Sequence, residues 1–435
     1  MKYVSTRGGA PVTLDQALRQ GIAADGGLYL PETLPDLALP KVSDGDDIKL
    51  TARAFLAPFF AGSDLEKHLD DIIAETFHFP IPVSALAVPA GHCDVLELYH
   101  GPTAAFKDVG AGFLAACLSR LEGDATQPMT ILVATSGDTG GAVAAAFDGR
   151  PGMRVIVLFP DGMVSARQAH QLTCWGDNVL SLAVDGTFDD CQAIVKAAMA
   201  DPRLNDQHRF SSANSINIGR LLPQAIYYAH ASVLHKLRTG NQPGFIIPTG
   251  NLGNAFACYL ARATGMPIGD IILATNANRL IGDYLDGAAW EPRASIQTLA
   301  SAMDVGNPSN MERLRHVGGE AKDLVGNIRA HSVTDEQITQ QIRRDFDELN
   351  RVSCPHTATA TFVWQHLDEA SRLTQDWIIV ATAHAAKFEQ IVEPIIGERV
   401  ALPAVLADIL EKPSDAVHIE ASMMAFEAAL EDRFG

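Results

Sequence analysis

The sequence is poor in basic residues. Among its 435 residues, 33 Lys and Arg stand against 52 Asp and Glu, so the formal net charge is −19. Because a surface of this sign repels the phosphates of nucleic acids, we expect no nucleic-acid partner. A disordered chain is also excluded, since it would combine high charge with low hydrophobicity, and this chain is 47% hydrophobic. An anionic small ligand would need a pocket that is positive only locally.

Cysteine pairs, an apolar leader and long apolar runs are lacking as well. The six cysteines form no CxxC pair, so we expect reduced core thiols and neither a disulfide framework nor a metal site. The first residues, MKYVSTRGGAP, contain no apolar stretch of the kind found in signal peptides. No apolar run approaches the roughly 20 residues that cross a bilayer. These absences favour a soluble, cytoplasmic protein that does not enter the membrane.

What the sequence does contain is a recurring order of short apolar runs, polar loops and helical stretches. Runs this short and uniformly apolar predict strands buried on both faces, as in parallel sheets between helices, and so an α/β fold. The predicted strands are Val95–Tyr99, Ile131–Ala134, Val155–Phe159, Phe245–Pro248, Ile271–Ala274 and Ile378–Ala381. The predicted helices include Val109–Leu121, Ala142–Phe147, Ala255–Thr264 and Ala385–Ile396.

At roughly 150 residues per domain, the length suggests two or three domains. A Pro-rich connector, FPIPVSALAVP, sets off an N-terminal subdomain over residues 1–92. A polar segment, SANSINIGR, suggests a further boundary between α/β domains over residues 93–220 and 221–435. The loops after five of the six apolar runs would then lie at the carboxyl ends of strands, where open α/β sheets bind ligands.

The segment HGPTAAFKDVGAGF places a lysine, Lys107, between a strand and a helix among small and apolar residues. Burial disfavours the ammonium form, so the pKa of a lysine in such a setting falls and its amine becomes a nucleophile for Schiff-base chemistry. A lone lysine at a helix start is more often simply exposed, and the flanking residues are what favour the chemical interpretation.

Two glycine-rich segments follow predicted strands. TGNLGN, at Thr249–Asn254, can bring backbone amides onto an anion at a helix N-terminus, although an ordinary strand–turn–helix joint fits it about as well. It matches neither the Walker A loop nor GxGxxG. TSGDTGG, at Thr135–Gly141, offers hydroxyls and one carboxylate, Asp138, at another helix start. Both loops suit a phosphate or carboxylate ligand.

Other polar segments are less specific. SANSINIGR brings Asn214, Asn217 and Arg220 close together, which suits recognition of an oxyanion or, equally, a helix cap. His356 and His384 follow buried segments, but a lone histidine is more often a structural hydrogen-bonder than a base. There is no HExxH motif for a metal and no GxSxG motif for a hydrolase.

Taken together, these segments resemble the threonine synthase family of pyridoxal-phosphate enzymes. The likeness covers nearly the whole chain in order, and its AMDVGNPSN segment is similar to the longer bacterial and fungal branch of the family. It rests on STRG, DGGLYLP, LYHGPTAAFKD, ATSGDTGGAVA, SANSINIGR, PTGNLGNAFA, ATNAN, AMDVGNPSN, PHTA and TAHAAKF. The resemblance implies the tryptophan-synthase-β-like fold (fold type II), with two α/β domains around the cofactor and an N-terminal subdomain.

The resemblance also implies a cofactor site for pyridoxal 5′-phosphate. Lys107 would be the catalytic lysine that forms a Schiff base with the cofactor, and Thr382 would face its pyridine nitrogen. Asp138 would lie near its 3′-oxygen. The cofactor phosphate would be cradled by Gly250, Asn251, Leu252, Gly253 and Asn254.

A substrate site and a reaction follow from the same resemblance. Ser136 and Thr139 would bind the substrate carboxylate, and Arg167, Asn214 and Arg220 are candidates for its phosphate. The implied reaction converts O-phospho-L-homoserine and water to L-threonine and phosphate, in a monomer or homodimer. Two alternatives stay open: a related phospholyase that releases 2-oxobutyrate, and a non-catalytic homologue that binds the cofactor or another anion.

Overall fold

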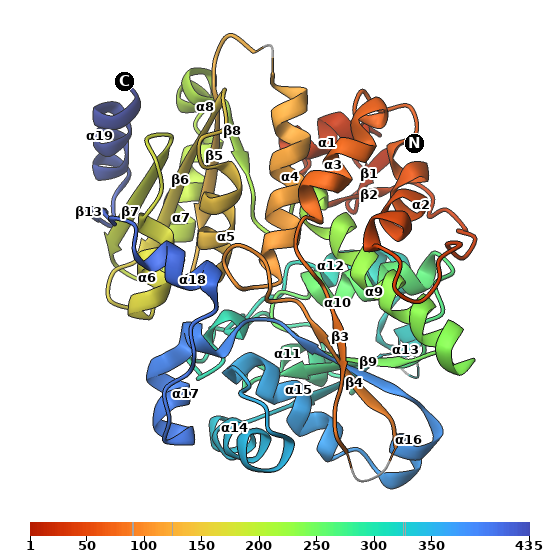
Figure 1. Cartoon of the computed structure of the whole chain (residues 1–435). Helices are drawn as coiled ribbons and strands as arrows, with labels where there is room; N and C mark the ends of the chain where they lie inside the picture. Colours follow the sequence, from red (N-terminus) through yellow and green to blue (C-terminus); the bar gives the residue numbers. More distant parts are fainter. Residues whose placement is uncertain (89–90, 124, 325, 327) are drawn as a thin grey trace.

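The computed structural model describes residues 1–88, 91–123, 125–324, 326 and 328–435. Two mainly parallel sheets dominate these residues, one above the other in Figure 1. The upper sheet runs, in spatial order, through β13 (Val417–Glu420), β7 (Val179–Asp185), β6 (Met153–Pro160), β5 (Met129–Ala134) and β8 (Phe210–Ser212). The lower sheet runs through β11 (Ile328–Ser332), β10 (Ile271–Thr275), β9 (Gly244–Pro248), β12 (Trp377–Ala381), β4 (Cys93–Glu97) and β3 (Val83–Ala85).

An N-terminal unit packs beside the upper sheet. Its strands β1 (Tyr3–Ser5) and β2 (Tyr29–Pro31) pair antiparallel, and α3 contacts α4 while α2 contacts α9. Its helices are α1 (Leu14–Gln20), α2 (Ile48–Phe60), the 3₁₀ turn η1 (Glu66–His68) and α3 (Leu69–Thr76).

The remaining helices cover and connect the two sheets. In the first half of the chain they are α4 (Lys107–Leu121), α5 (Asp138–Phe147), α6 (Ala166–Thr173), α7 (Phe188–Ala200), α8 (Pro202–His208), α9 (Ile218–Thr239) and α10 (Gly253–Ala263). Further on they are α11 (Leu280–Leu285), η2 (Ser301–Met303), α12 (Met311–Gly318), α13 (Ala321–Leu324), α14 (Asp335–Leu349), α15 (Pro355–Gln365), α16 (Glu369–Thr374), η3 (Ala385–Phe388), α17 (Glu389–Ile396), α18 (Ala404–Leu410) and α19 (Met423–Phe434). Among the described residues, no helix combines the length and apolarity needed to cross a bilayer.

The strands are buried on both faces, as their uniform apolarity predicts. In β9, Phe245 and Ile247 join one core cluster with α9 and α10, whereas Ile246 between them joins another with α15. In β5, Val133 packs in the cluster that holds α5 and Leu132 in the one that holds α7. Because side chains alternate along a strand, helices therefore cover each sheet on both faces. All six predicted apolar runs fall on strands of these two sheets.

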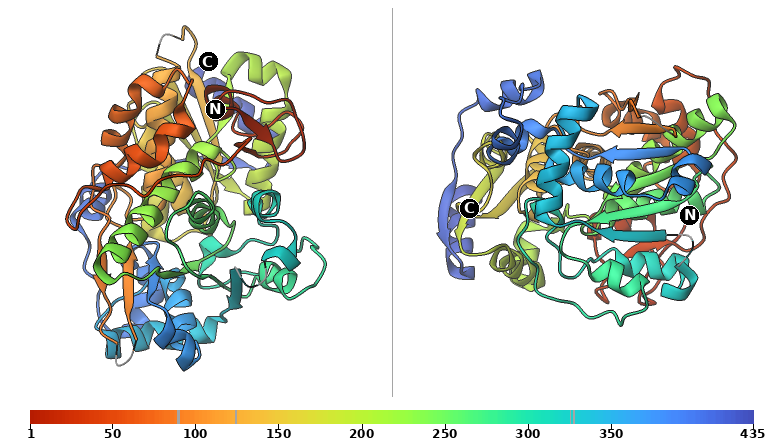
Figure 2. Two further views of the ribbon diagram at one scale, coloured as in Figure 1. Left: turned by 90° about the vertical axis from the view of Figure 1, so that its right-hand side faces the viewer. Right: turned by 90° about the horizontal axis from the view of Figure 1, so that it is seen from below.

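The strands do not divide between the sheets at the expected boundaries. β3 and β4 join the lower sheet, where β4 pairs in parallel with β12 from Trp377↔Cys93 to Ala381↔Glu97. β13, near the other end of the chain, pairs with β7 and covers that edge of the upper sheet. The dark blue C-terminal segment accordingly lies alongside the yellow strands in Figure 1 and in the right-hand view of Figure 2. Each of the three expected ranges therefore contributes a strand to a sheet that is formed mainly by another range. These strands are β3 from residues 1–92, β4 from residues 93–220 and β13 from residues 221–435.

Candidate active site

A cleft lined by both polar and apolar residues opens where loops follow the carboxyl ends of β4, β5, β9 and β12. The lining side chains come from both sheets and from the start of α9. They are Phe106, Lys107, Asp138, Thr139, Ser215, Arg220, Gln224, residues 248–255, Ala302, Met303, His356 and Thr382.

Lys107 is placed at the cleft by the loop that precedes α4. The N–H of Phe106 donates to the Thr382 carbonyl at 2.8 Å, and the N–H of His384 donates to the Ala104 carbonyl at 3.0 Å. Ala104 adopts a left-handed conformation with φ of 54°, which non-glycine residues rarely adopt and which often marks functional loops. The loop after β4 is therefore held against the loop after β12, and Lys107 begins its helix between them.

The Lys107 amine is poised to act as a nucleophile. Burial lowers its pKa to about 8, the nearby Asp138 carboxylate raises it, and the cations of Lys387 and Arg220 lower it further. At pH 7, roughly a tenth of a group with this pKa is neutral. The structure thus agrees with the lowered pKa that its apolar sequence setting predicts.

The N-terminus of α10 forms a cradle for an anion. Leu252, just before the helix, has φ of 64°, and this turn leads into the first amides of α10 beside the cleft. Asn254 accepts hydrogen bonds from the Tyr227 and Tyr228 hydroxyls through Oδ1, which leaves its buried Nδ2 without a partner among the described residues. A Cβ on Gly250 would lie 2.7 Å from the Cα of Met303, so only glycine fits there. Backbone amides, a helix dipole and an unused amide donor together fit the phosphate of a cofactor.

Arg220 is a buried cation whose hydrogen-bonding groups are only partly satisfied among the described residues. Its side chain is 2% exposed, one Nη donates to the Ala213 carbonyl, and Nε has no partner in the described part of the chain. No carboxylate of the described residues forms an ion pair with it, and burial lowers its pKa to about 10. Arg313, also buried, instead donates to three oxygens, of Tyr29, Asn310 and Ile216. Asp108 is the nearby carboxylate that raises the pKa of Arg220, but it forms no ion pair with it, so Arg220 is a candidate to bind a second anion in the cleft.

The central ion pair of the cleft includes a residue that sequence reasoning missed. Lys387 Nζ lies 2.8 Å from Asp138 Oδ1 and donates to the Thr103 carbonyl at 2.7 Å. Burial by itself raises the pKa of Asp138, but Lys387 and Lys107 hold it well below its usual range. Asp138 begins α5 beside the upper sheet and Lys387 lies in η3 after β12, so the pair joins the two halves across the cleft. The available signal was a lysine in an apolar segment after a buried strand, the same signal that identified Lys107.

The other predicted residues divide into two groups. Thr139 and Thr382 line the cleft, whereas Ser136 and Asn214 are not among its lining residues. Arg167 lies outside the cleft too: its Nη1 donates to the Ala386 carbonyl at 2.5 Å, and its Nε lies 3.8 Å from Glu389. Its guanidinium therefore ties α6 to η3 and α17, in place of the expected contact with a substrate phosphate.

The Asn251 side chain forms hydrogen bonds that connect loops beside the cleft. Its Nδ2 donates to the Ser215 hydroxyl at 2.7 Å, and its Oδ1 accepts from the Ser309 amide at 2.6 Å. The side chain thus ties together the SANSINIGR, TGNLGN and AMDVGNPSN segments. A ligand contact from Asn251 would accordingly come from its backbone.

The two histidines serve as structural hydrogen-bonders. His356 lines the cleft, burial lowers its pKa to about 4, and its Nε2 accepts from the Ala302 amide at 3.1 Å. His384 caps η3, with Nδ1 accepting from the Ala386 amide at 3.2 Å. In both histidines the nitrogen that accepts this bond is therefore engaged by a backbone amide.

Three family models match the chain. The pyridoxal-phosphate dependent enzyme model matches residues 95–383. The models for the threonine synthase N terminus and the threonine synthase C-terminal region match residues 2–77 and 357–430. The matches together cover the N-terminal unit, the cleft and the strands of both sheets except β3 and the first residues of β4.

Individual proteins of known identity resemble the chain over most of its length. A threonine synthase from Escherichia coli is 38% identical over 408 residues, which is 92% of each chain. The crystal structure of threonine synthase from Escherichia coli superposes with a TM-score of 0.89 over 99% of this chain and 100% of that one. The structure of threonine synthase from Brucella melitensis with bound pyridoxal phosphate is 32% identical, with a TM-score of 0.91 over 100% of this chain and 99% of that one.

Proposed function

This chain belongs to the threonine synthase family of pyridoxal-phosphate-dependent enzymes, and we propose that it converts O-phospho-L-homoserine and water into L-threonine and phosphate. The observation that carries the proposal is the composition of the cleft: one desolvated lysine and two anion sites, at α10 and at Arg220. The cofactor and the proposed substrate each bring one phosphate. The net charge of −19 is therefore offset locally, by a helix N-terminus and a buried arginine.

The residues of the cleft fit pyridoxal phosphate. Lys107 would hold its aldehyde carbon, the amides of residues 250–254 and Asn254 Nδ2 its phosphate, and the Thr382 hydroxyl its ring nitrogen. A neutral hydroxyl at that position would leave the nitrogen unprotonated. When bound, the cofactor supplies a carbonyl group that condenses with amines and a conjugated ring that accepts electrons.

We assign the substrate phosphate to Arg220. Its guanidinium is buried, lacks a carboxylate partner among the described residues and lies at the start of α9 beside Lys107. A Cβ on Gly110 would come within 2.8 Å of the Arg220 carbonyl, and this close approach of α4 to α9 is what brings the two cations into one cleft. Thr139, at the start of α5, is the side chain we assign to the substrate carboxylate.

Lys107 is the group that moves protons. Its amine, with a pKa near 8 when it is free, can take the proton from Cα of the substrate, and loss of a second proton, from Cβ, then expels the phosphate from Cγ. A proton is returned at Cγ, and Cα regains its proton at the end. Asp138 raises the pKa of this amine and Lys387 lowers it, so the two charges of the pair largely offset each other. The pKa of the amine therefore stays close to the working pH. Water adds at Cβ to complete L-threonine.

The compartment and the assembly are part of the same proposal. The six cysteines are all free and buried, which supports a reducing compartment such as the cytoplasm. We further propose that the protein acts as a monomer or a homodimer.

Product analysis tests the proposed function. The purified protein, loaded with pyridoxal phosphate, is incubated with O-phospho-L-homoserine, and phosphate, threonine and 2-oxobutyrate are measured over time. We expect phosphate and threonine in equal amounts. Release of 2-oxobutyrate without threonine would identify a phospholyase instead, and absence of any phosphate release would identify a binding protein.

A further inference from the structure

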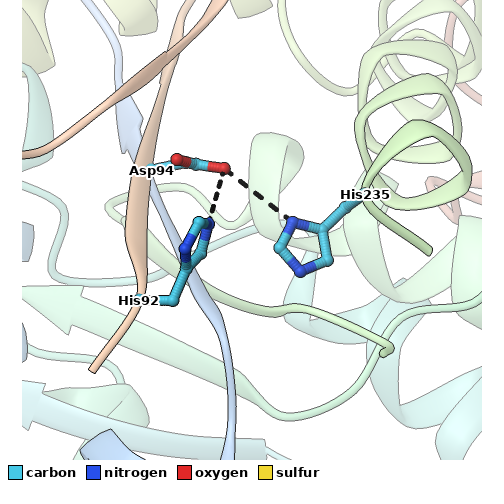
Figure 3. Close-up of side chains that lie close together, drawn as sticks. All are labelled: His92, Asp94 and His235. Carbon is cyan, nitrogen blue, oxygen red and sulfur yellow. Dashed lines mark hydrogen bonds and ion pairs between the residues drawn. The ribbon is translucent and has the colours of Figure 1, made fainter. Parts of the chain in front are cut away.

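Two histidines and an aspartate converge at the end of the lower sheet that lies away from the cleft. His92 and Asp94 stand at the amino end of β4, and His235 lies near the carboxyl end of α9. Figure 3 shows both imidazole rings turned toward the same carboxylate oxygen of Asp94. That oxygen, Oδ2, lies 3.2 Å from His92 Nε2 and 3.8 Å from His235 Nδ1, and the three atoms lie within 4.8 Å of one another.

His235 has one ring nitrogen engaged and one free. Its Nε2 lies 2.9 Å from Asp376 Oδ2, a hydrogen bond that places the ring proton on Nε2 in the neutral imidazole. The lone pair is then on Nδ1, which is buried and has no hydrogen-bond partner among the described residues. The side chain is 1% exposed, so solvent does not satisfy this nitrogen. The ring thus aims Nδ1 at the point where His92 and Asp94 meet, 3.8 Å from Asp94 Oδ2.

The charges around this point also favour a cation. Two carboxylates, Asp94 and Asp376, lie beside His235, and the nearby Arg238 reaches Asp94 only at 3.9 Å. Around this largely buried point, the two carboxylates outnumber the one arginine.

We propose that His92 Nε2, Asp94 Oδ2 and His235 Nδ1 bind a divalent cation of the zinc class. Imidazole nitrogens bind such ions at about 2.0–2.1 Å and carboxylate oxygens at about 2.0–2.2 Å, so ligand atoms separated by 3.2 and 3.8 Å can share one ion with small side-chain adjustments. Asp376 acts as the outer carboxylate that orients a metal-binding histidine. His92 is 45% exposed, which gives the ion access and leaves room for water as a fourth ligand.

The site joins three elements that are distant in sequence. His92 and Asp94 come from β4, His235 from α9, and Asp376 immediately precedes β12. His235 lies 15 residues along α9 from Arg220, which at 1.5 Å per residue is about 22 Å from the cleft. The ion therefore holds α9 against the sheet and takes no part in catalysis.

Zinc titration of the untagged, pyridoxal-phosphate-loaded protein tests the proposal. After chelator treatment and desalting, ZnCl₂ is added in a calorimeter and, separately, before thermal unfolding. His92→Ala removes an exposed ligand, and Asp94→Asn removes the shared carboxylate. His316→Ala, which changes an exposed histidine on α12, is the matched control.

We expect one equivalent of zinc to bind and to raise the unfolding temperature. His92→Ala and Asp94→Asn should each weaken binding at least tenfold, whereas His316→Ala should bind as the unsubstituted protein does. The rate of threonine formation should stay within about twofold in His92→Ala. No saturable binding, or equal affinity in His92→Ala and the control, would overturn the proposal.

Discussion

The Asp138–Lys387 pair offers a quantitative test of how the cleft is held together. Lys387 is 1% exposed and Asp138 is 6% exposed, and their charged atoms lie 2.8 Å apart. At an effective dielectric constant of about 20, their attraction is about 6 kcal/mol, most of which offsets the cost of burying both charges. Lys387→Met removes the cation that forms the ion pair and leaves the buried Asp138 carboxylate with Lys107 as its remaining cationic neighbour. We expect this variant to lose about 3–5 kcal/mol of unfolding free energy, a large share of the roughly 5–15 kcal/mol of a typical protein.

A double-mutant cycle separates the interaction energy of the Asp138–Lys387 pair from the destabilisation that each substitution causes by itself. Asp138→Asn, Lys387→Met and the double variant are unfolded in urea without cofactor and followed by circular dichroism. Because the double variant removes both charges of the pair, we expect it to be more stable than Lys387→Met alone, with a coupling energy of about 2–3 kcal/mol. Strictly additive losses in the two single variants would refute the reasoning, since they would mean that the two charges do not stabilise each other.

Three further predictions concern ligands of the cleft. Because the pKa of Lys107 is about 8 and only its neutral amine reacts, the rate of pyridoxal phosphate binding to the apo protein should rise about ninefold from pH 6 to 7 and about fivefold from pH 7 to 8, and level off above about pH 9; a flat stopped-flow profile would contradict this. Arg220→Ala should raise the KM for O-phospho-L-homoserine at least tenfold while cofactor absorbance stays unchanged, and equal loss of both in steady-state assays and spectra would assign Arg220 a structural role. Gly250→Ala should weaken pyridoxal phosphate binding at least tenfold, because its Cβ would lie 2.7 Å from the Cα of Met303; unchanged affinity in a fluorescence titration would show that the loop adapts.

The strands and the principal lysine were predictable because their signals are local. Short runs such as Phe245–Pro248 are apolar at every position because helices cover both faces of their sheet. A uniformly apolar run of this length is visible in the sequence itself. Lys107 was found for a similar reason. A lysine among small and apolar residues after a buried strand implies desolvation, and its lowered pKa follows from burial first.

The pairings across the fold were not predictable from one sequence. Lys387 meets Asp138, and β13 meets β7, only because the chain crosses between the two sheets more than once. Arg167 illustrates the converse: the family resemblance implied that it binds the substrate phosphate, but in the structure its guanidinium contacts Ala386 and Glu389. Local sequence patterns indicate which residues are buried, but they do not indicate which buried residues contact one another.

The most direct test of the account compares threonine formation by the unsubstituted protein and by Lys107→Ala, both loaded with pyridoxal phosphate and given O-phospho-L-homoserine. We expect the unsubstituted protein to release threonine and phosphate in equal amounts, and Lys107→Ala to form threonine at least about a thousandfold more slowly while its circular dichroism spectrum is unchanged, since it lacks the amine that moves the protons. Threonine formation by Lys107→Ala at close to the unsubstituted rate would contradict the central claim that this lysine carries the chemistry.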